Sequence, residues 1–227
     1  MCLLLAAFTV TALGSCSEHA SPDAASLAAV QDRKAKLPEP CFFAAGPLND
    51  KDSELFAAAG AGNVVQVQKM LETGANVNSA DALGRTPLFS AAFCHQAQVA
   101  TLLLDRGGIA DARDFTGMTP LHVAVVAGAS EVAKLLLEKG ALINIQTSSG
   151  RTPLHLAAAT DQLGLAELLL ERGADSRLRD MNGATAVSIA SDNSHPKIAT
   201  AIRKWLAAQK ALPHSEADRS LGFGGGK

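Results

Sequence analysis

Short apolar runs separated by polar turns recur along the middle of the chain. Three of them contain a Leu-Leu-Leu triplet, at residues 99–104, 132–137 and 165–170. An apolar face of this width lets a helix contact a neighbour on either side. A glycine that suits the left-handed end of a helix follows each run, at Gly107, Gly140 and Gly173. The pattern predicts helices that pack side by side.

A second pattern, Gly-x-Thr-Pro-Leu, precedes these runs. It occurs at Gly84-Arg85-Thr86-Pro87-Leu88, Gly117-Met118-Thr119-Pro120-Leu121-His122 and Gly150-Arg151-Thr152-Pro153-Leu154-His155. The glycine tolerates a turn with positive φ, the threonine can cap a helix, and the proline suits the first helical position. The three copies are spaced 33 residues apart, and a fixed period of this length is typical of a repeat solenoid.

The 33-residue period divides the chain into five units: 49–80, 81–113, 114–146, 147–179 and 180–210. The end units depart from the pattern. In the first, Ser53 is expected to cap the opening helix. In the fifth, Leu206 stands where glycine would end the last helix. That helix is therefore expected to continue to about Gln209, with Trp205 shielding the end of the core.

Together these patterns resemble the ankyrin repeat, and the resemblance covers residues 49–210. It implies an all-α solenoid of about five 33-residue helix-turn-helix units with β-hairpin fingers. It also implies that His122 and His155 form hydrogen bonds with the backbone of the adjoining finger. One unit cannot bury its own apolar face, so its stability comes from its neighbours.

Composition supports a helical globular domain and gives no sign of catalysis. The chain has 227 residues, of which 48% are hydrophobic and 4% aromatic, and its formal net charge is −2. This charge gives no reason to expect a nucleic-acid partner. No spacing brings an acid, a base and a nucleophile together, and no metal motif occurs. We therefore expect no enzyme activity, cofactor, metal or small-molecule substrate. Residues 211–227, which are glycine-rich at the end, are expected to be disordered.

The beginning of the chain resembles the signal peptide of bacterial lipoproteins. Residues 2–13 are apolar and end in Leu13-Gly14-Ser15-Cys16, which is similar to a lipobox. The resemblance implies that residues 1–15 are removed and that Cys16 carries a lipid anchor in the periplasm, on the outer membrane. No Lys or Arg precedes the apolar run. Secretion into the soluble periplasm, or an uncleaved apolar segment, therefore stays open. Residues 16–48 are expected to form a flexible tether.

Export would make a disulfide more favourable than free thiols. Cys41 opens the apolar patch Cys41-Phe42-Phe43, and Cys94 lies at the expected end of an inner helix. These two cysteines can pair if the patch folds over the first unit. Two separate thiols are the alternative.

The ankyrin resemblance implies a concave protein-binding face, made of finger tips and the exposed side of the inner helices. Matching by position places there Leu83, Arg85, Phe93, Arg113, Phe115, Met118, Val126, Arg151, Arg179 and Met181. Aromatic and Met residues ringed by Arg are typical of an interface hot spot. We expect a locally acidic protein partner with an apolar projection. Phe93 and Val126 can instead pack between helices.

The sequence thus predicts a non-catalytic protein-interaction module, monomeric alone, in the bacterial envelope. One version is an inhibitor or immunity protein, and another is a scaffold for a periplasmic enzyme. A cytoplasmic or secreted ankyrin effector and an unrecognised envelope hydrolase remain alternatives.

Overall fold

The computed structural model describes residues 48–211, with side chains described for residues 48–209. This range holds ten α-helices in five pairs. The pairs are α1 (Asp50–Gly60) with α2 (Val64–Glu72), α3 (Pro87–Phe93) with α4 (Ala97–Asp105), α5 (Pro120–Ala127) with α6 (Ser130–Glu138), α7 (Pro153–Ala159) with α8 (Leu163–Glu171), and α9 (Ala186–Asp192) with α10 (Pro196–Ala211). The expected tether, signal and lipidated Cys16, and nearly all of the expected tail, lie outside the described residues.

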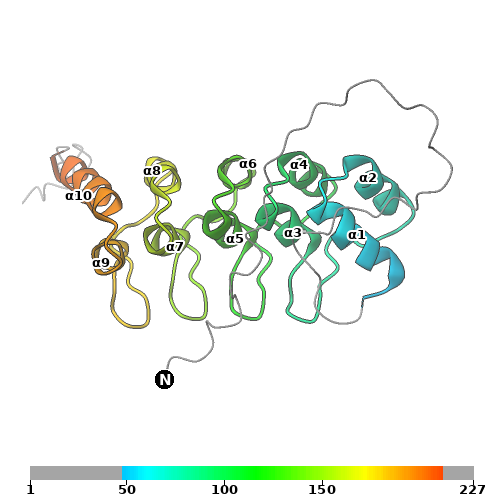
Figure 1. The fold of residues 1–227 in the computed structure, drawn as a ribbon, viewed down its shortest axis with the longest axis horizontal. Coiled ribbons are helices and arrows are strands. Elements are labelled where there is room, and N and C mark those ends of the chain that lie inside the picture. Colours follow the sequence, from blue (N-terminus) through cyan, green and yellow to red (C-terminus); the bar gives the residue numbers. More distant parts are fainter. Residues whose placement is uncertain (1–47, 212–227) are drawn as a thin grey trace, which may run out of the picture. The chain divides into compact units, whose positions relative to one another are not determined.

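The odd-numbered helices form one row and the even-numbered helices a second (Figure 1). We call them the inner and the outer helices. Consecutive pairs are joined by four loops that extend beyond the inner row, and we call these loops fingers 1 to 4 (residues 73–86, 106–119, 139–152 and 172–185). The predicted solenoid of five helix pairs is confirmed. Within the described range the fingers are built from tight turns, and no residue forms a β-strand.

Each later inner helix begins after a threonine at the repeat position, which is followed by proline in α3, α5 and α7 and by Ala186 in α9. The caps are Thr86, Thr119, Thr152 and Thr185, all with extended backbone. The prediction of Ser53 as the first cap is wrong, because α1 begins earlier. The side chain of Asn49 accepts a hydrogen bond from the Asp52 amide at 2.8 Å and starts the helix there. Asn is a strong cap, and Asp50 and Asp52 in the first turn suit the positive end of the helix dipole.

The core is a single apolar layer between the two helix rows. Small residues such as Ala91, Ala92, Ala157 and Ala158 are fully buried on the inner helices and let the rows approach closely. The outer helices contribute the middle leucine of each triplet, at Leu103, Leu136 and Leu169. At the far end α10 continues to Ala211, two residues beyond the expected Gln209. Trp205 packs partly buried against the core, as expected.

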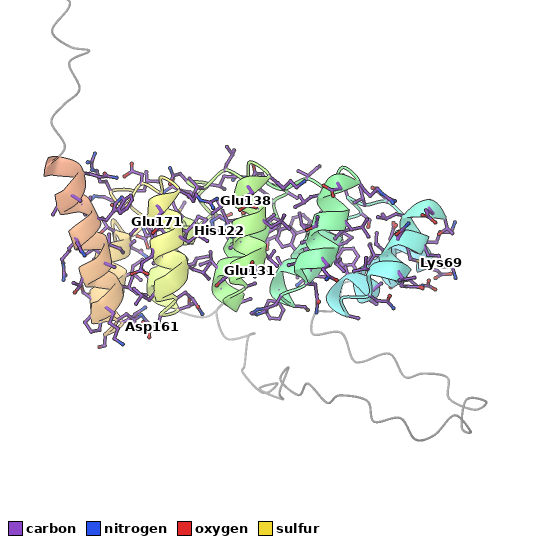
Figure 2. All side chains as sticks on the ribbon, turned by 90° about the horizontal axis from the view of Figure 1, so that it is seen from above. Lys69, His122, Glu131, Glu138, Asp161 and Glu171 are labelled. Carbon is purple, nitrogen blue, oxygen red and sulfur yellow. The ribbon has the colours of Figure 1, made fainter. Side chains whose placement is uncertain are left out.

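The outer helices lie side by side with their charged residues exposed (Figure 2). Two ion pairs connect the ends of adjacent outer helices. Lys139 Nζ lies 2.7 Å from Asp105 Oδ1, and Arg172 Nη2 lies 3.8 Å from Glu138 Oε1. Both pairs are exposed, so each contributes little to stability. Among the described helices, none combines the length and the apolar character needed to cross a membrane.

Candidate protein-binding surface

The tips of the four fingers are joined to one another by backbone hydrogen bonds. The amide of Phe115 donates to the carbonyl of Leu83 at 2.9 Å. In the next fingers, Ser148 donates to Thr116 at 2.8 Å and Met181 donates to Ser149 at 3.0 Å. The same repeat position donates each time. The tips therefore form one continuous edge along the array.

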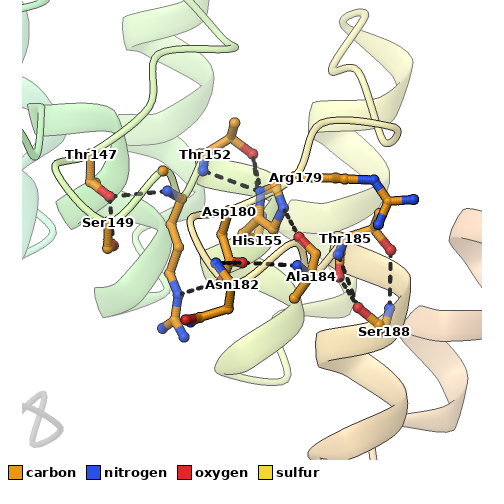
Figure 3. Close-up of polar contacts among 12 residues, drawn as sticks. Thr147, Ser149, Thr152, His155, Arg179, Asp180, Asn182, Ala184, Thr185 and Ser188 are labelled. Carbon is orange, nitrogen blue, oxygen red and sulfur yellow. Dashed lines mark hydrogen bonds and ion pairs between the residues drawn. The ribbon is translucent and has the colours of Figure 1, made fainter. Parts of the chain in front are cut away.

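Inside each finger, the first tip residue holds the turn. Asp81 Oδ1 accepts hydrogen bonds from the amides of Leu83 and Arg85, each at 2.9 Å. Asp114 and Asp180 accept the equivalent pairs of amides in fingers 2 and 4. In finger 3 the Thr147 hydroxyl accepts from the Arg151 amide at 3.1 Å. Figure 3 shows the contacts of Thr147 and Asp180. These bonds fix the turn, and the following side chains project from it.

The structure places three of the predicted apolar residues on the finger tips. Phe115 is 76% exposed, Met181 77% and Leu83 46%. The Phe115 ring lies over finger 1, since a methyl group added at Gly84 would meet its Cδ1 at 3.1 Å. Leu83 and Phe115 therefore form one apolar patch, and Met181 projects from the last finger of the same edge.

The other predicted apolar residues lie deeper. Met118 and Phe93 are partly buried and pack against the core. Phe93 also takes part in a further interaction, so it is not a free surface group. Val126, at the equivalent position one repeat later, is 38% exposed. The burial of Phe93 therefore agrees better with packing between helices than with contact with a partner. Val126 remains accessible to a partner.

The four predicted arginines all contact the fingers. Arg85 Nη2 lies 2.6 Å from Asp81 Oδ2 within its own finger, and Arg151 Nε lies 3.6 Å from Asp180 Oδ2 in the next finger. Arg113 Nη1 donates to the Gln146 carbonyl at 3.4 Å, and Arg179 Nη1 to the Gly183 carbonyl at 2.6 Å. In the range that the structure describes, Arg113 and Arg179 have no carboxylate partner. Their positive charges remain uncompensated there.

Asp180 is held ionised at the centre of the last finger. Its burial acts to raise the pKa, but the amides of Ala184 and Asn182 and the nearby Arg151 and His155 lower the pKa below its ordinary value. Donors that favour the charged form outweigh the loss of hydration here. The ion pair with Arg151 therefore links fingers 3 and 4 at neutral pH.

His122 and His155 connect inner helices to the next finger, as predicted. His122 Nδ1 accepts from the Thr119 amide at 3.1 Å, and its Nε2 lies 3.2 Å from the Arg151 carbonyl. His155 repeats this with the Thr152 amide and the Ala184 carbonyl, both at 3.2 Å (Figure 3). Because Nδ1 accepts, the proton of the neutral ring lies on Nε2 and is donated to the carbonyl. Both groups serve the structure of the fingers.

Burial changes the protonation of these two imidazoles. It lowers the pKa of His122 from 6.5 to about 4, and it also lowers the pKa of His155. Hydrogen bonds to backbone carbonyls oppose this effect but do not cancel it. Both rings are therefore neutral at physiological pH.

Cys94 is the C-cap residue of α3, is 8% exposed and forms a disulfide bond. The only other cysteines of the chain are Cys2, Cys16 and Cys41. All three lie outside the described residues, so the predicted Cys41–Cys94 pairing and the lipidation of Cys16 remain predictions.

Sequence reasoning missed the residues that join neighbouring fingers. The Asn78 side chain accepts from the Ile109 amide, Asp111 from the Leu142 amide and Asn144 from the Asp175 amide. Asn78, Asp111 and Asn144 are spaced 33 residues apart, as are Asp81 and Asp114. Comparing polar residues at equal repeat positions could have found both sets. In the part of the chain that is described, no group of three or more His, Cys, Asp or Glu residues could hold a metal ion.

Comparison with known families agrees with this geometry. The family described as ankyrin repeats (3 copies) matches residues 55–147 and 141–211. The two matches together span most of the chain and nearly all of the helical array. No match was found among curated proteins.

Proposed function

The chain belongs to the ankyrin repeat family, and from this premise we propose that it binds a partner protein along its finger tips without catalysing a reaction. Ankyrin repeats are protein–protein interaction modules. The observation that carries the proposal is the exposed apolar set Leu83, Phe115 and Met181 on a continuous edge. Exposed apolar patches rimmed by polar residues mark interaction sites. None of these three side chains is needed to fill the core of the described residues.

The rigidity of the tips favours binding. The tip backbone is fixed by its own Asp or Thr side chain and by the preceding finger. A side chain on a fixed backbone loses less conformational freedom when it binds. Phe115 and Met181 are thus suited to fill apolar pockets on a partner, whereas the surrounding tip residues provide shape.

The charges around the tips favour a locally acidic partner, although fewer arginines contribute than the sequence suggested. Arg85 and Arg151 are already paired with Asp81 and Asp180. Arg113 and Arg179 are exposed and contact carbonyl groups of the fingers. We assign the recognition of acidic groups to these two. Rim charges of this kind mainly increase the association rate and make it dependent on salt.

We place this interaction in the bacterial envelope, with Cys16 as the lipid anchor on the outer membrane. The proposal is supported by the lipobox-like Leu13-Gly14-Ser15-Cys16 and by the disulfide of Cys94, since disulfides persist in oxidising compartments. The partner is then an envelope protein, either an enzyme that the chain inhibits or one for which it is a scaffold. A cytoplasmic effector would have to keep this disulfide in a reducing compartment.

The binding surface is tested with the double variant Phe115→Ser/Met181→Ser. Each side chain is expected to contribute about 2 kcal/mol to binding if it is a hot spot, so capture of the specific envelope partner should be lost. The control is Ile109→Ser/Leu142→Ser, which removes two exposed apolar residues away from the tips. Capture from envelope extract is followed by mass spectrometry. If the partner is captured equally by the wild type, the double variant and the control, the assignment of the binding surface to the finger tips is contradicted.

The location is tested separately with Cys16→Ser and with globomycin, which blocks lipoprotein signal cleavage. Lipidation predicts membrane-bound wild type, accumulation of the uncleaved form with globomycin, and loss of acyl chains in the variant. Wild-type protein that fractionates with the cytoplasm contradicts the envelope proposal but leaves the binding surface untouched.

A further inference from the structure

Fingers 2 and 4 carry the same three-residue motif, and fingers 1 and 3 do not. The motif is Arg-Asp followed by a large apolar residue, at 113–115 and 179–181, and we call it the tip motif. Its two copies lie 66 residues apart, which is two repeat lengths. The corresponding residues are Ala-Asp-Ala at 80–82 in finger 1 and Gln-Thr-Ser at 146–148 in finger 3. Charged and apolar side chains therefore recur on every second finger.

We infer that fingers 2 and 4 together bind one extended, acidic segment of a protein partner. Two acidic side chains of this segment, six residues apart, contact Arg113 and Arg179. An apolar side chain beside each of them contacts Phe115 or Met181, and finger 3 contacts the backbone in between. The inference rests on the function proposed above and specifies the shape and the charge of the partner.

The two arginines are held in place through finger 3. Arg113 Nη1 donates to the Gln146 carbonyl at 3.4 Å. Gln146 Nε2 donates in turn to the Arg179 carbonyl at 3.0 Å, and Arg179 Nη1 donates to the Gly183 carbonyl at 2.6 Å. A guanidinium has five N–H donors, and both arginines are exposed. Donors therefore remain on each of them for a carboxylate of the ligand, which Arg binds well.

The aspartate of each tip motif is engaged inside its own finger. Asp114 Oδ1 accepts from two amides of finger 2, and Asp180 Oδ1 accepts from two amides of finger 4. Asp180 Oδ2 also lies 3.6 Å from Arg151 Nε. Donors within the turns thus satisfy these carboxylates, whereas the arginine and the apolar residue on either side of each are exposed.

The distance between the two motifs selects the spacing in the ligand. The helices α5, α7 and α9 that follow fingers 2, 3 and 4 pack against one another in turn, and packed helices lie about 8–10 Å apart. Two such steps amount to about 16–20 Å. An extended chain advances about 3.3 Å per residue, and its side chains alternate between two sides. Six residues span about 20 Å and return to the same side, whereas five point to the opposite side and four are too short.

The same alternation fits the two halves of the tip motif. Neighbouring side chains of an extended chain point to opposite sides. An acidic residue can therefore face the arginine while the next residue faces the apolar tip. Leu83 adjoins Phe115, so the apolar surface at finger 2 is larger than that of Met181 at finger 4. The end of the segment at finger 2 accordingly carries the larger apolar side chain.

Finger 3 favours an extended chain over a helix. An extended segment has backbone amides and carbonyls that need partners when they lose water. Ser148 and Ser149 on finger 3 are exposed, and a hydroxyl can both donate and accept. Ser149 Oγ lies 3.0 Å from Thr147 Oγ1 and keeps capacity for a further bond (Figure 3). A helix pairs its own backbone groups and would gain little from this polar middle.

Synthetic peptides test the spacing on the full chain. The panel consists of Ser-rich peptides with two Asp-Leu pairs, whose aspartates lie four, six or eight residues apart. Two controls are the six-residue peptide with Asn for Asp and a helical peptide with aspartates 14 residues apart on one face, which spans about 21 Å. Affinity is measured by fluorescence anisotropy at low salt, where exposed charges are least screened.

The six-residue spacing should bind at least tenfold more tightly than every other peptide of the panel. Equal affinity for all spacings would overturn the inference. Tighter binding of the helical peptide would assign the site to a helix instead. No binding of any peptide at about 1 mM would also overturn the inference, since this corresponds to only about 4 kcal/mol of binding free energy.

The variants Arg113→Gln and Arg179→Gln test the assigned contacts. Each should weaken binding of the six-residue peptide at least fivefold and remove the preference for this spacing. The matched control is Arg177→Gln, which removes an exposed arginine of finger 4 outside the tip motif. Circular dichroism verifies the fold of all three variants. If Arg113→Gln and Arg179→Gln bind the peptide as the control does, the inference is wrong.

The proposed function fails by a different result. Capture of the envelope partner that is unaffected by Phe115→Ser/Met181→Ser contradicts the binding surface, whatever the peptides show. Capture that is lost in this double variant, together with peptides that bind without preference for spacing, supports the surface and overturns only the extended acidic segment.

Discussion

At the scale of single residues, the two buried histidines show how a titratable group can stabilise a turn without chemistry. His122 accepts at Nδ1 from the amide that opens its own helix and donates from Nε2 to the next finger. A proton added to Nδ1 would face the Thr119 N–H, so the helix cap and the neutral ring depend on each other. Burial lowers the pKa of His122 to about 4, and the hydrogen bond to the Arg151 carbonyl opposes this effect only in part.

We expect the free energy of unfolding to fall as the pH is lowered from about 7 to 4. The folded-state pKa of His122 is about 4 and lies below its unfolded value of 6.5. The unfolded chain therefore binds the proton first, and up to about 3 kcal/mol is lost between these values. His155 acts in the same direction. The loss from Asp180 belongs to lower pH, because its pKa is below the ordinary range of a carboxyl.

Urea unfolding at pH 4.5 to 8 measures this dependence. The variant His122→Gln, which cannot titrate, should be less stable at pH 8 but show a smaller decrease on acidification. His95→Gln is the control, because His95 is exposed at a helix junction. Identical slopes for the wild type and His122→Gln would disprove the assignment.

At the scale of elements, the fingers depend on how closely consecutive turns approach. Gly150 has φ of +77°, and a methyl group there would lie 2.8 Å from the Met181 amide nitrogen of the next finger. Gly183 occupies the same position in the last finger with φ of +76°, and nothing lies within 4 Å of a methyl group there. The two glycines share a backbone conformation but not an environment.

Gly150→Ala is therefore expected to cost more stability than Gly183→Ala. The left-handed conformation costs either alanine about 1–2 kcal/mol. Only at Gly150 must the Met181–Ser149 hydrogen bond shift as well, which adds about 1 kcal/mol or more. Urea unfolding of both variants measures the difference. Equal losses would show that the fingers do not pack as closely as described.

The sequence was sufficient to predict the elements but not the contacts between fingers. Period, glycines and Thr-Pro pairs located the inner helices, because these residues act within one unit. The pairing of Arg85 with Asp81 and of Arg151 with Asp180 depends on three-dimensional stacking, so the sequence alone indicated four available arginines. The N-cap of α1 was predicted at the wrong residue, because Asn49 and Ser53 are both capping residues. Which of them caps the helix depends on where α1 meets finger 1.

The structure shows why Asn49, and not Ser53, caps α1. Starting α1 at Asp50 places Asp52 at the base of the first finger, where Oδ1 accepts from the Asn76 amide at 2.9 Å. Asn49 Nδ2 also donates to Asp52 Oδ2 at 2.7 Å. A start at Ser53 would remove Asp52 from the helix and leave this part of finger 1 without its acceptor.

At the scale of the described array, the extensive helix contacts join neighbouring repeats. Inner helices contact the next inner helix, outer helices the next outer helix, and each finger the next finger. The effect of pH on stability and the effect of salt on binding therefore arise from groups in one repeat or in two neighbouring repeats. Stability should behave as a sum of repeat and interface contributions, with the end repeats opening most readily.

Two cavity-forming variants distinguish this behaviour from a single cooperative unit. Ile198 of α10 and Leu136 of α6 are both fully buried, so either change to alanine removes about 2–5 kcal/mol locally. Ile198→Ala should increase native-state hydrogen exchange in α9 and α10 while α5 and α6 stay protected, because only the last interface is lost. Leu136→Ala should increase exchange in α5 and α6 and in the helices on both sides. An equal increase across the array in both variants would mean that the repeats unfold together.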